Sequence, residues 1–450
     1  MNLVNKLKQE FNNSSDLIIR QLDKIYVIYL ESICDSNKIN FYILRNISQK
    51  NIISGPNTII IKEFKDIIFY LVNGFTIVIK DKIYAVETRG NIIRSVEKPD
   101  SEPSVYGPKD AFNENIQINL GLIKRRIKST NLINDDYFIG TKTKTKVSII
   151  YLKDIVQEKM INKIKKEIAS INKDSIISIG NLKQLLGKEN RSFLPTIMES
   201  ERPDNACTSL LEGKIIILCD NSPFCLILPA FFSDFINPVV DNYGKNININ
   251  FLKILRFICL IFTIIAPALY ISLINFDQEL VPITLLRNFA IQRNDVAFPS
   301  WIEALIMLIV CGILKESDMR FPSSYGSAIS IVGALILGEA AVSAGLISPI
   351  MIIVVSLAFI SSLVFTDQEL VNGLRYYRFL FLLLSSLFGL IGLVMGIFIL
   401  LIHVSGLEVL GKSYAFPVAP FSKTYFNKTI FKKPSKKDYK KDTMLIKGDN

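Results

Sequence analysis

Two carboxylates lie in apolar stretches of this 450-residue chain. Glu303 follows Phe298-Pro299 at the start of one stretch, and Glu339 is the one charged residue in 321–365. An acid at the centre of a bilayer costs roughly 3 kcal/mol, so each is expected to face protein or water. A ring of Glu339 side chains from several subunits would favour cations. In the alternative, each acid lies near the membrane interface or is buried beside an arginine such as Arg320.

Small residues accompany Glu339 at helical spacing. They recur every three or four positions, which places them on one face of a helix: Gly326, Ser330, Ala334, Gly338, Ala341 and Gly345. Such a face lets another backbone approach closely. We interpret these residues, with Glu339, as candidates for the lining of a narrow pore on an oligomer axis. The alternative is tight helix packing inside one subunit.

A dense charged turn is formed by Glu201, Arg202, Pro203 and Asp204. Pro203 and Asp204 are typical of the start of a helix. No nucleophile, phosphate-binding loop or metal-ligand cluster accompanies the turn in the sequence. We therefore interpret it as a structural, ion-paired motif rather than a catalytic site.

Histidine and cysteine usage argues against common catalytic and metal sites. The single histidine, His403, lies in an apolar stretch and is expected to be a hydrogen-bonded packing residue. No two of the six cysteines have the C-x-x-C spacing of zinc or redox sites. We therefore expect reduced, mostly buried thiols in a reducing compartment. We expect no enzymatic activity, no cofactor and no bound metal.

Charge is spread unevenly, although 52 Lys and Arg against 41 Asp and Glu give a net charge of +11. Residues 1–256 carry a net +8, residues 257–411 a net −4 and residues 412–450 a net +7. This pattern predicts a soluble head, a membrane block and a basic tail. The expected domains are two α/β subdomains (1–105 and 106–250), a transmembrane helical domain (251–411) and a basic C-terminal tail (412–450).

The apolar stretches predict four transmembrane helices, at 257–276, 323–344, 348–366 and 379–403. Gly345 and Ser348-Pro349 break the long stretch between the second and third of them. Residues 298–314 contain Glu303 and form a poor independent span, so we interpret them as a re-entrant or buried segment that does not cross. In the alternative they do cross, the number of crossings is odd, and one end of the chain lies outside. The Lys and Arg residues at both ends of the block place the head and the tail on the cytoplasmic side, which requires an even number of crossings.

Two similar orders of elements predict that the head is a pair of related α/β subdomains. The first has a strand at 26–30, helices at 36–46 and 64–72, and a hairpin of 75–80 and 83–88. The second has a strand at 147–152, a helix at 154–171 with Asp154 as its N-cap, a helix at 204–211, and a hairpin of 214–219 and 224–228. The alternative is a chance similarity between common units.

A basic cluster, Lys124 to Arg126 with Lys128, lies between the two subdomains. It has the charge to meet an anionic lipid or a nucleic acid. We favour a solvated helix face or a strip of salt bridges between subunits. Residues 141–146 alternate Thr and Lys, which predicts an edge strand.

A series of short motifs runs in order through the chain. In the head they are Glu102-Pro103 with Gly107-Pro108, Asn119 with Arg125-Arg126, Gly140-Thr-Lys-Thr-Lys144, Ser200-Glu-Arg-Pro-Asp204, Leu211-Glu-Gly213, and Asp220 with Pro223 and Phe231-Phe232. In the membrane block they are Pro267-Ala-Leu-Tyr270, Phe298-Pro299 with Glu303, Ile331-Val-Gly-Ala-Leu335, Gly338 with Val342, and Ser348-Pro349. From about Asp16 to Pro420 the chain resembles the A subunits of spore germinant receptors, the GerA family.

The resemblance implies a subunit of a nutrient-sensing complex in the inner membrane of a dormant spore. In that family the A subunit has a two-part cytoplasmic N-terminal domain and is thought to form a homo-oligomeric ring with a gated ion channel. The implied partners are a B-type, transporter-like subunit that takes the germinant and a C-type lipoprotein. Channel opening would release monovalent cations and start germination, and no nucleic-acid partner is implied.

The sequence is also compatible with two other functions. The chain is a non-conducting scaffold or signal relay if the basic cluster and the Lys-rich tail serve to gather partners. A secondary transporter would use broken helices, but we see no inverted repeat in the membrane block.

Overall fold

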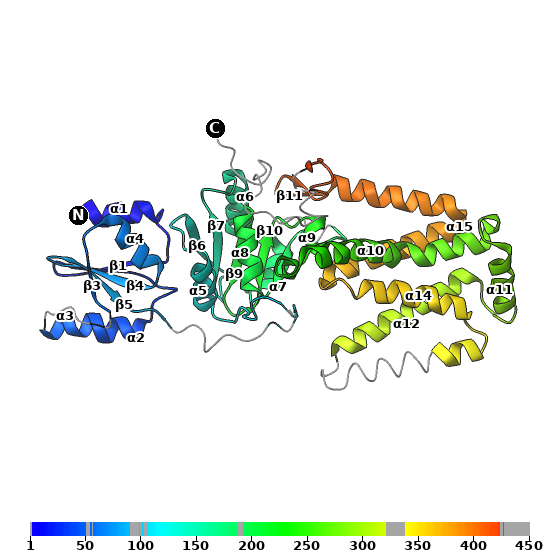
Figure 1. Ribbon diagram of the computed structural model, residues 1–450, viewed down its shortest axis with the longest axis horizontal. Coiled ribbons are helices and arrows are strands. Elements are labelled where there is room, and N and C mark those ends of the chain that lie inside the picture. Colours follow the sequence, from blue (N-terminus) through cyan, green and yellow to red (C-terminus); the bar gives the residue numbers. More distant parts are fainter. Residues whose placement is uncertain are drawn as a thin grey trace.

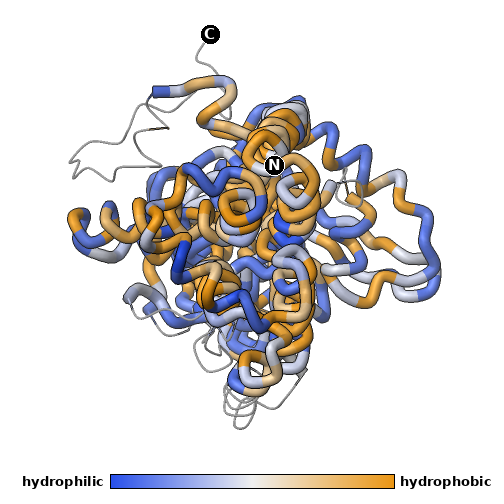
Figure 2. The backbone as a smooth tube through the Cα atoms, turned by 90° about the vertical axis from the view of Figure 1, so that its right-hand side faces the viewer, coloured by the Kyte–Doolittle hydropathy of each residue, from blue (hydrophilic) through white to orange (hydrophobic). Residues whose placement is uncertain are grey.

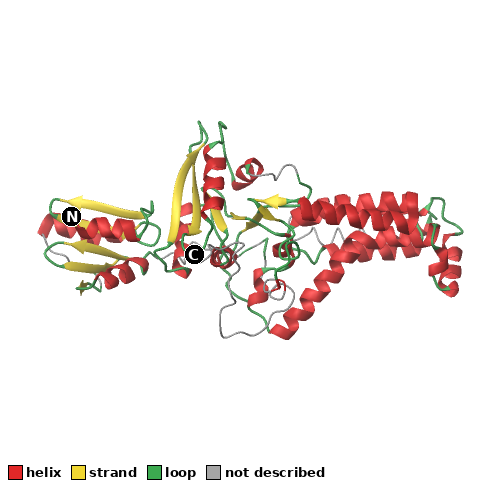
Figure 3. Ribbon diagram, turned by 90° about the horizontal axis from the view of Figure 1, so that it is seen from above, coloured by secondary structure: helices red, strands yellow, loops and turns green. Residues whose placement is uncertain are grey.

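The computed structural model describes residues 2–50, 55, 57–90, 99, 101–102, 106–186, 192–320, 338–423 and 426. The molecule is elongated, with a strand-containing head at one end and a block of long helices at the other (Figures 1 and 3). Seen from the helical end, hydrophobic and hydrophilic stretches of the backbone tube lie intermixed (Figure 2). The head and the helical block (residues 246–406) are described in turn.

The first unit of the head is a five-stranded antiparallel sheet in the order β1-β2-β4-β5-β3. Its strands are β1 (Leu17–Leu22), β2 (Ile25–Leu30), β3 (Ile59–Ile61), β4 (Phe75–Ile79) and β5 (Ile83–Glu87). Its helices are α1 (Asn2–Glu10), α2 (Ser36–Lys38), the π-helix η1 (Ile39–Leu44), α3 (Arg45–Lys50) and α4 (Phe64–Val72).

The second unit has the same strand order, β6-β7-β9-β10-β8. Its strands are β6 (Leu132–Ile139), β7 (Thr145–Leu152), β8 (Met198–Ser200), β9 (Ile215–Cys219) and β10 (Cys225–Leu228). Its helices are α5 (Ile116–Arg126), α6 (Glu158–Ala169), α7 (Ile179–Leu185), α8 (Pro203–Leu211), α9 (Phe232–Ile236) and the 3₁₀ helix η4 (Val239–Asn242). The head is thus α/β with two sheets of one topology.

The side chains of each central strand point alternately to the two faces of its sheet, and helices pack against both faces. In β2, Ile28 and Leu30 join the core under α1 and α4, whereas Val27 and Tyr29 pack against η1. In β7, Ile150 and Leu152 pack with α5 and α8, and its neighbouring side chains pack with α6. The core that contains α1, α4, α5 and α8 is continuous between the two units.

Two sequence expectations for the head are wrong in detail, and edge strands are missed. The helix expected from Asp154 begins at Glu158 with Gln157 as its N-cap, because residues 152–156 form a hydrogen-bonded turn first. Residues 141–144 also form a turn, with Lys144 at φ 46°, and the strand starts at Thr145. The edge strands β1 and β6 were not predicted, since each shows only partial burial.

The basic cluster of α5 is used inside the chain. Lys124 is buried and forms an ion pair with the buried Asp16 of the first unit, which also accepts hydrogen bonds from Ser32. Arg126 pairs with Asp110 at 2.6 Å, and Lys128 Nζ donates to the side-chain oxygen of Asn73. The favoured expectation of a solvated or inter-subunit strip is therefore wrong for Lys124, because burial of its stem between the two units brings its charge to Asp16.

The helical block contains α10 (Asn246–Asn275), the 3₁₀ helix η5 (Gln278–Leu280), α11 (Ile283–Arg293), α12 (Ser300–Arg320), α14 (Pro349–Ser362) and α15 (Gln368–Gly406). Among the described residues, α10 and α15 are long and apolar enough to cross a membrane. Residues 338–343 are also helical, and most of the helix expected at 323–344 lies outside the described residues. The strands β11 (Glu408–Val409) and β12 (Lys412–Ser413) follow the block.

Helix α10 contains a proline whose effect is offset by an arginine. Pro267 has no N–H, so the carbonyl of Thr263 loses its helical donor. The Nε of Arg378, from α15, donates to that carbonyl at 2.6 Å. This contact satisfies a freed backbone group in an apolar environment, where water is not at hand to do so.

The long helix α15 is a hairpin, which corrects the single span expected at 379–403. Gly389 has φ 59° and ψ −137°, which breaks the helix into legs at 368–388 and 390–406. The legs lie antiparallel, since Tyr377 contacts His403 and Phe381 lies against Gly396. The sequence has no charge or proline at the turn, so hydropathy predicts one continuous span where the structure has two legs.

The helical block meets the head at the start of α15. Glu369 forms an ion pair with the buried Lys183 of α7, and the Phe193 ring lies 5.1 Å from that of Tyr376. After the hairpin the chain returns to the head, where Tyr414 is fully buried and its carbonyl accepts from the N–H of Phe232. The first leg of α15 therefore runs away from the head, and the second leg runs back.

We predict that Gly389→Ala destabilises the protein by roughly 3 kcal/mol, because a side chain at positive φ is strained and its Cβ would lie 2.7 Å from that of Phe276. Thermal unfolding of the full chain in detergent measures the change. Gly312→Ala in α12 is the control, since nothing lies within 4 Å of the added Cβ. Equal unfolding midpoints for the two variants would contradict the hairpin.

Candidate functional site

The buried acid Glu303 joins three elements at the end of the block far from the head. Its side chain has no exposure to solvent. Oε2 accepts hydrogen bonds from the backbone N–H and the hydroxyl of Ser348, at 2.9 and 2.8 Å. Oε1 lies 3.5 Å from Nη2 of Arg293, at the end of α11. We call Glu303, Arg293 and Ser348 the Glu303 cluster.

Helix ends explain why a charge is tolerated there. Glu303 lies in the first turn of α12, and Ser348 is the N-cap of α14, so the carboxylate meets the positive ends of two helix dipoles. Charge-assisted hydrogen bonds to Ser348 add to this attraction. The arginine partner is Arg293, so the alternative of a buried ion pair holds for Glu303, although with an arginine other than Arg320.

Gly345 connects the Glu303 cluster to the preceding helical segment. Its φ is 64°, and an added Cβ would lie 2.6 Å from the carbonyl oxygen of Asp295. Its own carbonyl accepts from the N–H of Ala297 at 3.0 Å. Gly345 therefore lies in a close turn after the helix at 338–343, not on the helix face proposed for the other small residues.

The helical segment 338–343 exposes the second acid. Glu339 is exposed, and nothing lies within 4 Å of a Cβ placed on Gly338. Ala341 is half-buried against the core that surrounds the Glu303 cluster. The remaining residues proposed for the small-residue face, Gly326, Ser330 and Ala334, lie outside the described residues.

The charged turn at 201–204 lies in the head, and its arginine is almost fully buried. Arg202 makes a bidentate pair with Asp204, at 3.0 and 2.7 Å, and donates to the backbone carbonyls of Glu102 and Pro108. The hydroxyl of Tyr243, three residues before α10, donates to Asp204 at 2.8 Å. Burial opposes the charge of Asp204, but these hydrogen bonds prevail and hold its pKa below the usual value.

Glu201 and Glu102 complete this network. The carboxylate of Glu201 accepts from the backbone N–H groups of Ser101 and Glu102, at 2.6 and 2.8 Å. The carboxyl of Glu102 accepts from the hydroxyl of Ser200, yet burial raises the pKa of Glu102 to about 7. The charged turn therefore ties Ser101, Glu102 and Pro108 to α8 and to the approach to α10 in one polar network.

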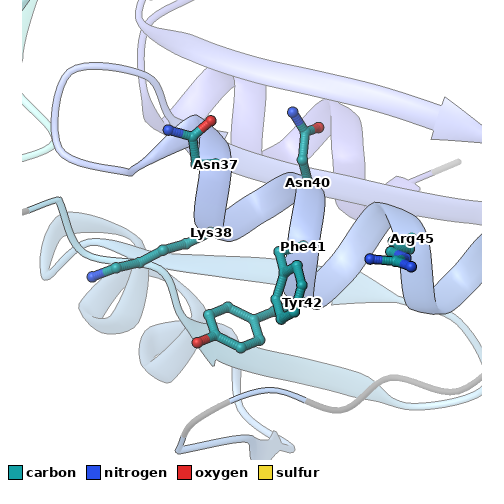
Figure 4. Close-up of a pocket in the computed structure, with 6 residues that line it drawn as sticks. All are labelled: Asn37, Lys38, Asn40, Phe41, Tyr42 and Arg45. Atoms are coloured by element: carbon teal, nitrogen blue, oxygen red, sulfur yellow. The ribbon is translucent and has the colours of Figure 1, made fainter.

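A separate pocket of about 600 Å³ lies on the first unit of the head (Figure 4). One helical stretch supplies its lining: Asn37, Lys38, Asn40, Phe41, Tyr42 and Arg45. Phe41 is 58% exposed, and the Nζ of Lys38 donates to the backbone carbonyl of Arg89. None of the residues singled out from the sequence lines this pocket.

The structure adds partners that the sequence did not reveal. Tyr243 and Glu102 are far in sequence from the residues that they contact, Asp204 and Arg202, and Arg293 comes from the helix before that of Glu303. The sequence indicates Ser348 only as part of a helix break. His403 hydrogen-bonds to Tyr377, in line with the expectation of a packing role. The described residues contain no group of three or more His, Cys, Asp or Glu arranged to hold a metal ion.

We predict that Glu303→Gln destabilises the full chain in detergent by about 2 kcal/mol, because the amide loses the charge that meets Arg293 and two helix ends. Glu279→Gln is the matched control, since Glu279 is exposed in η5, and it is expected to change stability by less than about 0.5 kcal/mol. Thermal unfolding measures both. A Glu303→Gln variant as stable as the control would contradict the role given to this carboxylate.

We predict a pH effect from Glu102. Its pKa is about 7 in the folded chain and about 4.5 in the unfolded one, so its contribution to stability is fully present below about pH 4.5 and is lost as pH rises to about 7. Over that window the parent chain should lose about 3 kcal/mol relative to Glu102→Gln, which does not titrate. Unfolding measured across the pH range for both chains tests this, and parallel profiles would contradict it.

Comparisons with known proteins extend over nearly the whole chain. The family model described as "Bacillus/Clostridium GerA spore germination protein" matches residues 5–444. Spore germination protein KA of Bacillus subtilis (strain 168) is 33% identical over 466 aligned positions, which cover 98% of this chain and 86% of that protein. The uncharacterized membrane protein YfkQ of the same organism is 31% identical over 430 positions, which cover 91% of this chain and 84% of that protein.

A solved structure is also similar. It is the crystal structure of the N-terminal domain of the A subunit of the Bacillus megaterium spore germinant receptor GerK3, at 27% identity and a TM-score of 0.39. The match covers 52% of this chain and 95% of that chain. On the family model and the relative that is 33% identical over most of both chains, the protein belongs to the GerA family of spore germination proteins.

Proposed function

We propose that the chain is the channel-forming A-type subunit of a nutrient germinant receptor in the spore inner membrane. Copies of the chain assemble into a ring, and the ring opens a path for cations when a germinant is sensed. The head lies on the cytoplasmic side, and the role is not enzymatic. The partners are a B-type, transporter-like subunit that takes the germinant and a C-type lipoprotein.

The exposed Glu339 is the observation that carries the proposal. An acid among apolar helices needs water, a partner protein or a counter-charge. In the part of the chain that the structure describes, Glu339 is exposed, and nothing lies within 4 Å of a Cβ placed on Gly338. Placed around a symmetry axis, several copies of Glu339 would form a ring that concentrates cations.

The Glu303 cluster supports a gating role for the same region. It holds the start of α14 to the start of α12, and Gly345 follows the helical segment that carries Glu339. A movement of α14 therefore shifts the residues that precede it. The head reaches the block through Lys183 and Glu369, so a change in the head has a direct path to α15.

The structure bears differently on the two competing functions, a scaffold and a secondary transporter. A scaffold role loses one of its two supports, because Lys124, Arg126 and Lys128 of the basic cluster bind residues of the same chain. The break of α15 at Gly389 favours a secondary transporter as the second candidate, since transporters bind substrates at broken helices. Saturable uptake of a nutrient by this chain alone would support that candidate.

We predict that Glu339→Gln lowers the rate of potassium release by about tenfold or more, because the loss of the acidic ring removes the local enrichment of cations. Glu339→Lys should lower it further, since the ring then repels cations. The measurement is ion flux from liposomes or spores that contain the complete receptor.

Glu279→Gln is the control for this experiment too, since it removes an exposed acid from the same chain. Gly338→Leu adds a test of shape. No described atom lies within 4 Å of a Cβ added at Gly338, so a loss of flux with unchanged thermal unfolding assigns the effect to the assembly. Unchanged flux in all the Glu339 and Gly338 variants would overturn the channel proposal.

A further inference from the structure

Two exposed aromatic rings lie together where the head meets the helical block. Phe193 of the head, five residues before β8, is 61% exposed, and Tyr376, on the first leg of α15, is 59% exposed. Their ring centroids are 5.1 Å apart, and the ring of His403, on the second leg, lies 6.4 Å from that of Phe193. We call Phe193 and Tyr376 the aromatic pair.

The head segment that carries Phe193 is packed closely against α15. The next residue, Leu194, is buried in the core that contains Leu370 and Leu374 of α15. A Cβ added at Gly373 would clash with the carbonyl oxygen of Phe193, so the lack of a side chain at Gly373 lets the two backbones meet. These contacts hold the Phe193 ring on the surface of α15.

The aromatic pair lies at the level where the charge-free part of α15 begins. Tyr376 stands between Arg375 and Arg378, and residues 379–407 carry no charged side chain. Tyr376 is eight residues from the start of α15, which is about 12 Å along the helix axis. In membrane proteins, a boundary between basic and apolar residues marks the membrane interface, where tyrosine rings are enriched.

The aromatic pair continues the exposed apolar face of α15. Leu383 and Leu387 lie seven and eleven residues after Tyr376, close to two and three helical turns, so the three side chains share one face. Both leucines are more than half exposed. An apolar helix face that is exposed in the single chain meets acyl chains once the helix spans a membrane.

We propose that the Phe193 ring of the head inserts into the lipid beside Tyr376, at the membrane surface on the side of the head. The proposal rests on the membrane location given under the proposed function. The partner is the boundary between head groups and acyl chains, where an apolar ring gains free energy by leaving water. Together with the ion pair of Lys183 and Glu369, two turns back along α15, the inserted ring holds the second unit at a fixed height above the membrane.

The test follows tryptophan emission of the full chain in vesicles. The chain has one tryptophan, Trp301, so a Trp301→Phe background leaves an introduced tryptophan as the sole reporter. Phe193→Trp is measured in phosphatidylcholine and in phosphatidylcholine with brominated acyl chains, which quench tryptophan on contact. Emission should fall about twofold in the brominated lipid, because the ring reaches the acyl chains.

Phe69→Trp in the same background is the matched control. Phe69 is 59% exposed, its ring lies 5.4 Å from that of Tyr70, and its helix α4 is in the unit farthest from the helical block (Figure 1). Its emission should be equal in the two lipids. The proposal is overturned if both variants are quenched equally or if Phe193→Trp is not quenched. In the latter case, emission at short wavelength assigns the cover to protein, such as a second copy, and emission at long wavelength leaves the ring in water.

Trp301 of the parent chain keeps this proposal apart from the proposed function. It lies in the first turn of α12 and is partly exposed, so it reports insertion of the block itself. If the brominated lipid quenches Trp301 but not the Phe193→Trp variant, the membrane location stands and the insertion of Phe193 is wrong. If neither is quenched, the membrane location fails, and the insertion of Phe193 fails with it.

Discussion

The pairing of the Glu303 carboxylate with the N–H and hydroxyl of Ser348 is the contact on which the helical block depends. It brings the first turns of α12 and α14 together in an apolar core, where a carboxylate without partners would be untenable. Arg293 adds the counter-charge from α11. Because the helical segment with Glu339 ends just before Ser348, this pairing also fixes where that segment leaves the block.

The same rule, that every buried polar group needs a partner, governs the other end of the block. Arg378 satisfies the carbonyl that Pro267 frees, and Lys183 meets Glu369 where the head touches α15. In the head, Arg202 donates to the carbonyls of Glu102 and Pro108, and Asp204 accepts from the hydroxyl of Tyr243. Tyr243 directly follows η4 and lies three residues before α10, so the head and the block are joined through polar contacts as well as apolar packing.

Sequence patterns anticipated those features that rest on local rules. Helix α4, the two hairpins and the break at Ser348-Pro349 follow from capping residues and alternation. Sequence patterns do not predict the features that depend on contacts between separate segments of the chain. The turn at Gly389 depends on a positive φ beside Phe276 and Asp277, which hydropathy does not register. The partners of Glu303 and Lys124 come from segments separated in sequence, and β1 and β6 are edge strands whose partial burial weakens the periodic signal.

The central claim is that the helical segment with Gly338 and Glu339 faces other copies of the chain. Cross-linking of a Gly338→Cys variant within the complete receptor tests it most directly, with Gly312→Cys on α12 and the parent chain as references. The account predicts disulfide-linked oligomers of this chain for Gly338→Cys and none above the parent level for Gly312→Cys. Receptors that are active but yield only monomers of the Gly338→Cys chain would contradict it.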